Sequence, residues 1–152
     1  GIGSDHARLG DRKGRHLFSA KQKAAQAAYA MAGISDPAAV IDVTEVYDAF
    51  TGAEIQSLEA LSLCAEGQGP AALNDGTFDA DGELPVNLSG GLIGQGGVPG
   101  ATGIAQAVMV DRLLADRYFD QDGSRPFRRG VIDVHGGICT VSAVHIMERA
   151  EP

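Results

Sequence analysis

Seven of the chain's glycines fall between positions 90 and 103, in the stretch SGGLIGQGGVPGATG. This stretch follows a short run of strand-forming residues and precedes an amphipathic run, so it predicts a strand, a tight turn and a helix in succession. The chain has 21 glycines in 152 residues, about twice the usual ~7%. Because glycine adopts positive φ and lets another group approach its backbone closely, their placement favours a compact turn in an α/β fold.

The backbone N–H groups of such a segment converge near a helix N-terminus, which suits an anion, a phosphate or a developing oxyanion. We expect the residues that bind substrate or stabilise an oxyanion to be Ser89, Gly90, Gly91, Gly94, Gly96 and Gly97. The alternative is a turn packed tightly against a neighbouring backbone. No Gly-Lys-Ser/Thr follows, so the segment is not a P-loop, and its spacing does not match a dinucleotide-binding fingerprint.

The rest of the chain alternates between helix and strand patterns. The predicted order is helix, strand, helix, strand, helix, strand and strand, at residues 20–32, 39–46, 51–64, 85–88, 105–119, 128–137 and 140–148. Strands that alternate with helices indicate an α/β sheet, and the last two strands give it an antiparallel edge. Residues 1–18 are polar and carry both signs of charge, so we expect an irregular lead-in there.

Local signals predict where the first two helices begin and end. Ser19 is a candidate N-cap and Gly33 a candidate C-terminal residue in the left-handed conformation. Thr51 is expected to cap the second helix, with Glu54 completing a capping box. The apolar face of the first helix is expected to hold Ala24, Ala27, Ala28 and Met31.

Composition excludes several classes of function. The net charge is −8, which argues against binding to a nucleic acid backbone. No apolar run approaches the ~18 residues that a membrane span needs, and the first 16 residues lack the apolar core of a signal peptide. The two cysteines, Cys64 and Cys139, cannot form a disulfide scaffold, so we expect a reducing, cytoplasmic setting. No C-x-x-C pair is present, and we predict no metal site.

Tyr47 is the first candidate catalytic residue. It follows a buried strand and precedes a helix, the usual place for a site in an α/β sheet. Its phenol could donate a hydrogen bond to a carbonyl oxygen or transfer a proton. The alternative is a packed tyrosine whose hydroxyl is satisfied within the fold.

Asp133, His135 and Cys139 form a second candidate cluster around the turn Gly136-Gly137. Side chains two residues apart on a strand share a face, so we expect Asp133 beside His135, where a carboxylate would raise the pKa of the imidazole. The pair would then act as a base. Cys139 is either a nucleophile or a small buried residue beside the glycines.

Four stretches occur in the order and spacing of a known family: AYAMAGI, VIDVTEVYDAFTGAEIQSLEALSLCAEGQG, LPVNLSGGLIGQGGVPGATGIAQ and GGICTVSAVHI. They resemble the C-terminal half of a thiolase, and in particular the sterol carrier protein-like and archaeal branch. The resemblance implies that residues 19–152 form a thiolase C-terminal domain with a five-stranded mixed sheet flanked by helices. It also implies that a full thiolase contains two such halves.

The sequence departs from the family at its catalytic motifs. Tyr47 stands where the branch has the His of His-Asp-Ala-Phe, and Gly97 stands where it has the His of Gly-His-Pro. Asp133 takes the third motif position, and His135 and Cys139 flank the turn Gly136-Gly137. The nucleophilic cysteine of a thiolase lies in the N-terminal half, and neither cysteine here occupies its place. Tyrosine at the first motif resembles the thiolase-like aldolases of steroid side-chain degradation, which also have a tyrosine at the Gly97 position.

The resemblance implies a half-enzyme, either a split subunit or a fragment, that makes or cleaves a carbon–carbon bond of a CoA thioester. It implies coenzyme A as a substrate and no tightly bound cofactor. The implied partners are an N-terminal thiolase half or second thiolase subunit, and a small zinc-ribbon and OB-fold companion that helps bind acyl-CoA. The competing interpretation is a catalytically degenerate scaffold or acyl-CoA-binding partner of an active subunit.

Overall fold

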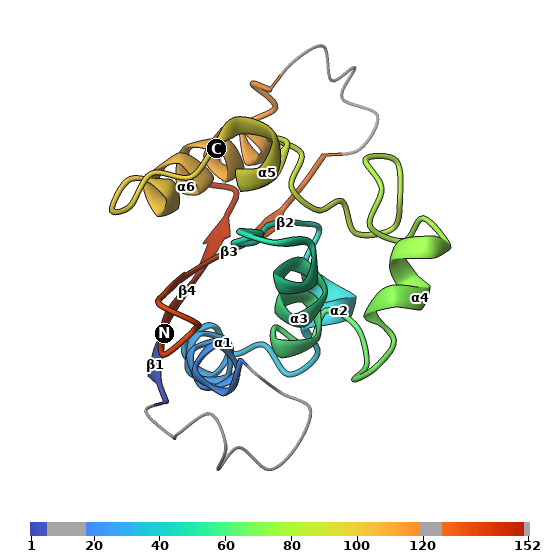
Figure 1. Cartoon of the computed structure of the whole chain (residues 1–152). Coiled ribbons are helices and arrows are strands. Elements are labelled where there is room, and N and C mark those ends of the chain that lie inside the picture. The colour runs from blue at the N-terminus through green and yellow to red at the C-terminus, as the bar shows by residue number, and fades with distance from the viewer. Residues whose placement is uncertain (6–17, 119–125, 151–152) are drawn as a thin grey trace.

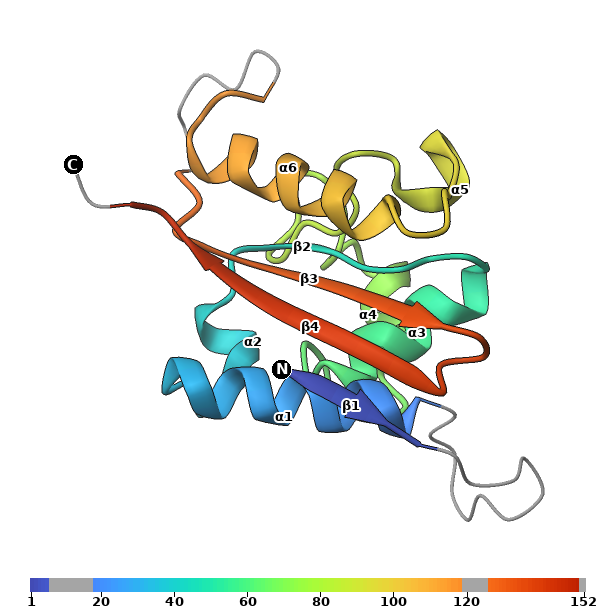
Figure 2. The ribbon, with the colours of Figure 1, turned by 90° about the vertical axis from the view of Figure 1, so that its left-hand side faces the viewer.

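The fold is a mixed β-sheet with helices on both faces (Figures 1 and 2). The computed structural model describes residues 1–5, 18–118 and 126–150. The strands are β1 (Ile2–Ser4), β2 (Val43–Glu45), β3 (Arg129–Gly136) and β4 (Val141–Glu148). Their order across the sheet is β1-β4-β3-β2, and β4 runs antiparallel to both of its neighbours while β2 and β3 are parallel.

Helices α1 (Ser19–Ala32) and α3 (Thr51–Ala60) cover one face of the sheet, and α6 (Thr102–Leu114) crosses the other (Figure 2). The short helices are α2 (Pro37–Val40), α4 (Gly69–Asn74) and α5 (Gly91–Gln95). Alternate residues of β3 enter different cores because side chains of a strand alternate between faces. Val131 packs in the core under α1 and α3, and Ile132 packs in the core under α6.

The sheet has four strands in the described part of the chain, not the five that the family resemblance implied. The predicted strand at residues 85–88 is reduced to one parallel bridge between Thr44 and Val86 at the outer edge of β2. Two backbone hydrogen bonds hold it there, from Thr44 to Pro85 and from Asn87 to Thr44. Pro85 has no N–H to donate and Asn87 has a φ of +51°, so pairing stops after one residue.

The predicted irregular lead-in is wrong at its start, because residues 2–4 form the edge strand β1 against β4. Gly3 permits this arrangement, since a Cβ atom there would collide with the carbonyl oxygen of Ala20 in α1. The remaining lead-in, residues 6–17, lies outside the described residues.

The predicted N-caps are also wrong. Phe18 and Phe50 occupy the N-cap positions of α1 and α3, and neither helix has a side-chain cap or the predicted capping box. The Ser19 hydroxyl instead donates to the Asp5 carboxylate. The predicted C-terminal glycine is confirmed, since Gly33 has a φ of +68° and ends α1. Helix α6 begins and ends earlier than predicted, at Thr102 and Leu114.

Helix α1 buries a different face from the predicted one. Ala24 and Ala28 are buried as expected, but Ala27 is exposed and Met31 is 84% exposed. The helix is rotated so that Lys21, Ala25 and Tyr29 point inward. The inward polar groups find partners there, which lets this face be buried.

Candidate functional site

An apolar cavity of about 1090 Å³ lies between α6 and the part of the sheet that α6 leaves uncovered. Exposed faces of α6 and β4 form its walls, with Ile104, Val108, Val141 and Met147 among the lining residues. Tyr47 and His135 both border it, together with residues of the glycine turn that precedes α6. The cavity therefore brings together residues from three of the sequence segments that predicted function.

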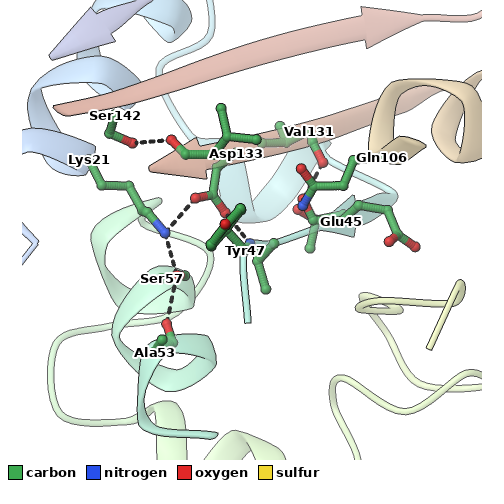
Figure 3. Close-up of polar contacts among 12 residues, drawn as sticks. Lys21, Glu45, Tyr47, Ala53, Ser57, Gln106, Val131, Asp133 and Ser142 are labelled. Atoms are coloured by element: carbon green, nitrogen blue, oxygen red, sulfur yellow. Dashed lines mark hydrogen bonds and ion pairs between the residues drawn. The ribbon is translucent and has the colours of Figure 1, made fainter. Parts of the chain in front are cut away.

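Tyr47 follows β2, where the strand leaves the sheet. Its backbone N–H donates to Asp133 Oδ1 at 3.1 Å (Figure 3). Its ring lies 4.6 Å from that of His135, centroid to centroid, with the two planes inclined at 56°. The structure thus joins two predicted catalytic residues that are far apart in the sequence.

His135 lies at the end of β3 and contacts the rings of both Tyr47 and Phe18, with the Phe18 centroid 5.2 Å away. Burial, helped by the positive charge of Lys21, lowers the pKa of His135 to about 4, against a smaller opposite effect of Asp133. Its Nδ1 atom is buried and has no hydrogen-bond partner in the described part of the chain. The predicted rise in the pKa of His135 is therefore wrong, because desolvation and the lysine outweigh the carboxylate.

Asp133 does not act as the partner of His135. It is fully buried and forms an ion pair with Lys21, which is also fully buried. Its other oxygen accepts the Tyr47 N–H. Both carboxylate oxygens are occupied by these contacts, so the predicted pairing of Asp133 with His135 as a catalytic base is not formed.

Neither cysteine reaches the cavity. Cys139 is fully buried in the β3–β4 turn, in a small cluster with Phe18, Ala20 and Ala53. It has a φ of +60°. The environment of Cys64 does not activate its thiol, since burial, with a smaller effect of Glu59, raises its pKa to about 11. The structure therefore favours the buried alternative for Cys139 over a nucleophile.

The start of the glycine segment is held by two buried carboxylates. Glu45 accepts from the backbone N–H and the hydroxyl of Ser89, at 3.0 and 2.5 Å. Asp48 accepts from the N–H groups of Leu92 and Ile93, at 2.6 and 3.4 Å. Burial raises the pKa of Glu45, against the lowering effect of the Ser89 bonds. Donors that were expected to face a ligand are thus used within the chain.

The glycine amides are used in the same way. The N–H groups of Gly90, Gly91, Gly94 and Gly96 each donate to a group of residues 87–92, in bonds of 2.8 to 3.1 Å. The predicted convergence of these donors toward a ligand is therefore absent. Gly97 is exposed and does not line the cavity, whereas the later part of the segment, from Val98 to Gly103, does.

Sequence reasoning missed the residues that hold this arrangement in place. Lys21 was hidden because a lysine in an alanine-rich helix usually faces solvent. Gln106 donates to the Glu45 carbonyl at 3.2 Å, and Asn87 accepts the Val46 N–H at 2.8 Å. These two amides secure one peptide unit at the end of β2. In the sequence, the place of Asn87 just before the glycine segment was the only indication that an amide side chain binds the backbone here.

In the described part of the chain, no group of three or more His, Cys, Asp or Glu residues is arranged to hold a metal ion. Nor does that part contain a helix with the length and apolar character needed to cross a membrane.

Comparison with known proteins agrees with this fold. Acetyl-CoA acetyltransferase of Methanothermobacter thermautotrophicus is 37% identical over 144 residues, which cover 93% of this chain and 36% of that protein. Sterol carrier protein 2 of Bos taurus is 42% identical over 93 residues, which cover 60% of this chain and 16% of that protein. The steroid side-chain-cleaving aldolase of Thermomonospora curvata is 38% identical over 89 residues, which cover 57% of this chain and 22% of that protein.

A solved structure of an Ltp2-ChsH2(DUF35) aldolase has a TM-score of 0.80 and 26% identity, and the match covers 98% of this chain and 38% of that one. The chain thus spans little more than a third of the acetyltransferase and of the aldolase structure. The sequence profile of the family described as Thiolase C-terminal domain-like matches residues 1–149. The chain belongs to the thiolase C-terminal domain-like family.

Proposed function

We propose that this chain is the C-terminal half of an enzyme that makes or cleaves a carbon–carbon bond of a CoA thioester, and that its chemistry is of the aldol type. The observation that carries the proposal is the contact between Tyr47 and His135, 4.6 Å apart at the border of an apolar cavity. Retro-aldol cleavage requires a proton acceptor and a hydrogen-bond donor, and an imidazole and a phenol can fill these roles. The steroid side-chain-cleaving aldolase among the relatives supports this class.

The roles follow from the chemistry of the two groups. His135 Nε2 takes the proton of a β-hydroxyl on the substrate, the Cα–Cβ bond breaks, and its electrons move into the thioester carbonyl. Tyr47 donates a hydrogen bond to the enolate oxygen that develops there. The enolate then takes that proton back from His135 at Cα, which regenerates the base and yields a carbonyl compound and a shortened acyl-CoA. A pKa near 4 keeps His135 deprotonated at neutral pH but makes it a weak base, so we assign the larger effect to Tyr47.

Thiolytic chemistry needs a further group. A thiolase reaction requires a thiolate nucleophile, and both cysteines of this chain lie away from the cavity. The nucleophile would have to come from another chain or domain, as would a base to replace the family histidine at Gly97. Coenzyme A is the common substrate component of both reactions, and neither needs a tightly bound cofactor.

The exposed wall of the cavity supports the proposal of a partner half. Ile104, Val108 and Val141 are 67%, 45% and 45% exposed, and soluble proteins rarely leave such a patch uncovered. An N-terminal thiolase half, in the same chain or a second subunit, is the proposed occupant. The solved aldolase has two proteins in its name, Ltp2 and ChsH2, which supports work in an assembly. We further propose a small zinc-ribbon and OB-fold companion as a member of that assembly.

The test compares two substrates with the native assembly. A β-hydroxyacyl-CoA supplied without free CoA should yield a carbonyl compound and a shorter acyl-CoA, detected by mass spectrometry. A 3-ketoacyl-CoA supplied with free CoA should react at least about tenfold more slowly. Reaction of the ketoacyl substrate alone, with an acylated cysteine on the partner, would instead identify a thiolase.

A degenerate scaffold is the second candidate, favoured by Gly97 and by glycine amides that bond within the chain. It predicts that the assembly binds acyl-CoA and that Tyr47→Phe leaves any turnover by the partner unchanged.

A further inference from the structure

Lys21 is a charged residue with no exposed surface, placed on the face of the sheet opposite α6. Its ammonium group forms an ion pair with Asp133 and donates to Ser57 Oγ at 2.5 Å. It also lies 4.9 Å from the centre of the Phe18 ring. A lysine is almost never buried completely unless its charge is paired. The side chains around Lys21 provide that compensation.

The contacts of Lys21 connect four parts of the fold (Figure 3). Lys21 is on α1, Asp133 on β3 and Ser57 on α3, and the Ser57 hydroxyl donates onward to the Ala53 carbonyl at 2.6 Å. The second oxygen of Asp133 accepts the Tyr47 N–H from the segment after β2. The chain of contacts therefore ends at the backbone of a residue that borders the cavity.

Stability alone does not explain this pair. The cost of removing two charges from water is large, and a well-packed apolar pair of the same volume is often as stable or more stable. A carboxylate anchored by an ammonium group offers the Tyr47 N–H a strong acceptor in a fixed direction. Lys21 itself does not line the cavity, so any effect on chemistry must pass through its neighbours.

We propose that Lys21 is a positioning residue for Tyr47 and His135, acting through Asp133 and Phe18 without touching substrate. Through Asp133 it fixes the point at which the Tyr47 segment leaves the sheet. Through Phe18 it holds a second ring that contacts His135. The importance of these two rings for turnover rests on the proposed function, whereas their placement by Lys21 does not.

The experiment uses the native assembly that contains this chain, in three variant forms. Ser57→Ala removes one hydroxyl and keeps both charges. Lys21→Met combined with Asp133→Asn removes both charges together, so that no unpaired charge is left buried. Lys23→Met is the matched control, because Lys23 is on the same helix and exposed. The measurements are amide-resolved hydrogen exchange at Tyr47, and kcat and KM for a CoA thioester.

The double variant should exchange the Tyr47 N–H at least about tenfold faster than the wild type. Its kcat should fall on the order of 100-fold with KM changed less than about threefold, as a small misplacement of a reacting group does. Ser57→Ala should show the same pattern at roughly a tenth of the size, and Lys23→Met should show neither change.

Wild-type exchange at Tyr47 and wild-type kcat in folded Ser57→Ala and double variants would overturn the proposal and leave Lys21 a purely structural residue. If the double variant does not fold, Ser57→Ala decides on the same two measurements. An assembly that turns over no CoA thioester, yet exchanges Tyr47 faster in Ser57→Ala, contradicts the proposed function and supports the positioning role.

Discussion

Tyr47 is the residue whose hydroxyl the proposed chemistry uses most directly. Tyr47→Phe keeps the ring and its contact with His135 and removes one oxygen. If that hydroxyl stabilises a developing oxyanion, its loss should cost about 2.7–4 kcal/mol in the barrier, or roughly 100- to 1000-fold in turnover. Steady-state kinetics and thermal melting on one preparation of the native assembly provide the check.

The competing expectation is that the Tyr47 hydroxyl only satisfies a hydrogen bond in the fold. Its removal should then cost about 1 kcal/mol of stability and leave turnover of the folded protein nearly intact. A Tyr29→Phe variant is a suitable control, because the Tyr29 hydroxyl donates to the Leu61 carbonyl at 2.8 Å inside the core. Near-normal turnover in Tyr47→Phe would remove the main support for aldol chemistry.

His135 should make the stability of the protein depend on pH. Its pKa is about 4 in the folded state against an ordinary 6.5, so the unfolded chain binds a proton that the folded chain excludes. The stabilising contribution is complete above pH 6.5 and is lost as the pH falls toward 4. After allowance for partial exposure, the loss is on the order of 2 kcal/mol.

A His135→Phe variant should lack this dependence, because a phenylalanine can contact the same two rings without titrating. The melting temperature of the wild type should therefore fall faster than that of the variant between pH 6.5 and 4.5. His145→Phe is the control, since His145 lies exposed on β4. Parallel pH profiles for wild type and His135→Phe would contradict the assignment.

At the scale of elements, α5 depends on one glycine more than on the others. Gly91 has a φ of +61°, and a Cβ atom there would collide with the Asp48 carboxylate. Gly91→Ala should destabilise the protein by about 2 kcal/mol or more, since both the conformation and the contact resist a side chain. Chemical denaturation in urea measures the change.

Gly94 is the matched control in the same helix. No atom lies within 4 Å of a Cβ built there, and its φ is not positive. Gly94→Ala should be neutral or stabilising by up to about 1 kcal/mol, because alanine is the better helix former. Equal destabilisation by the two substitutions would show that the Asp48 contact does not order the segment.

At the scale of the molecule, the uncovered apolar face predicts association. The chain expressed alone should not behave as a monodisperse monomer in size-exclusion chromatography. Ile104→Glu, placed on this face, should weaken binding to an N-terminal thiolase half at least about tenfold, because a carboxylate would be buried without a partner. Met31→Glu is the control, since Met31 is also exposed but lies on α1, across the sheet.

Titration calorimetry with the purified halves gives the comparison. Wild-type affinity in Ile104→Glu, or a cooperatively melting monomer of the chain alone, would mean that the face by α6 is not the docking surface.

Local patterns determined much of this protein from the sequence by itself. Glycine, proline and apolar periodicity act over a few residues, so they were enough for the helices near residues 20–32, 51–64 and 105–119 and for the last two strands. Gly33 ends α1 as its conformational freedom predicts. The resemblance of four ordered stretches was enough for the family, which the profile match confirms.

Only the tertiary structure decided how the polar groups are used. Lys21 is buried because Asp133, 112 positions away in the sequence, compensates its charge. The amides of Ser89 and Leu92 in the glycine segment are occupied because Glu45 and Asp48 reach them from the end of β2 and the residues just after it. The pKa of His135 falls because burial and a distant lysine outweigh the adjacent carboxylate. Each outcome depends on desolvation and on contacts between residues far apart in the sequence, and a local sequence pattern contains no information on either.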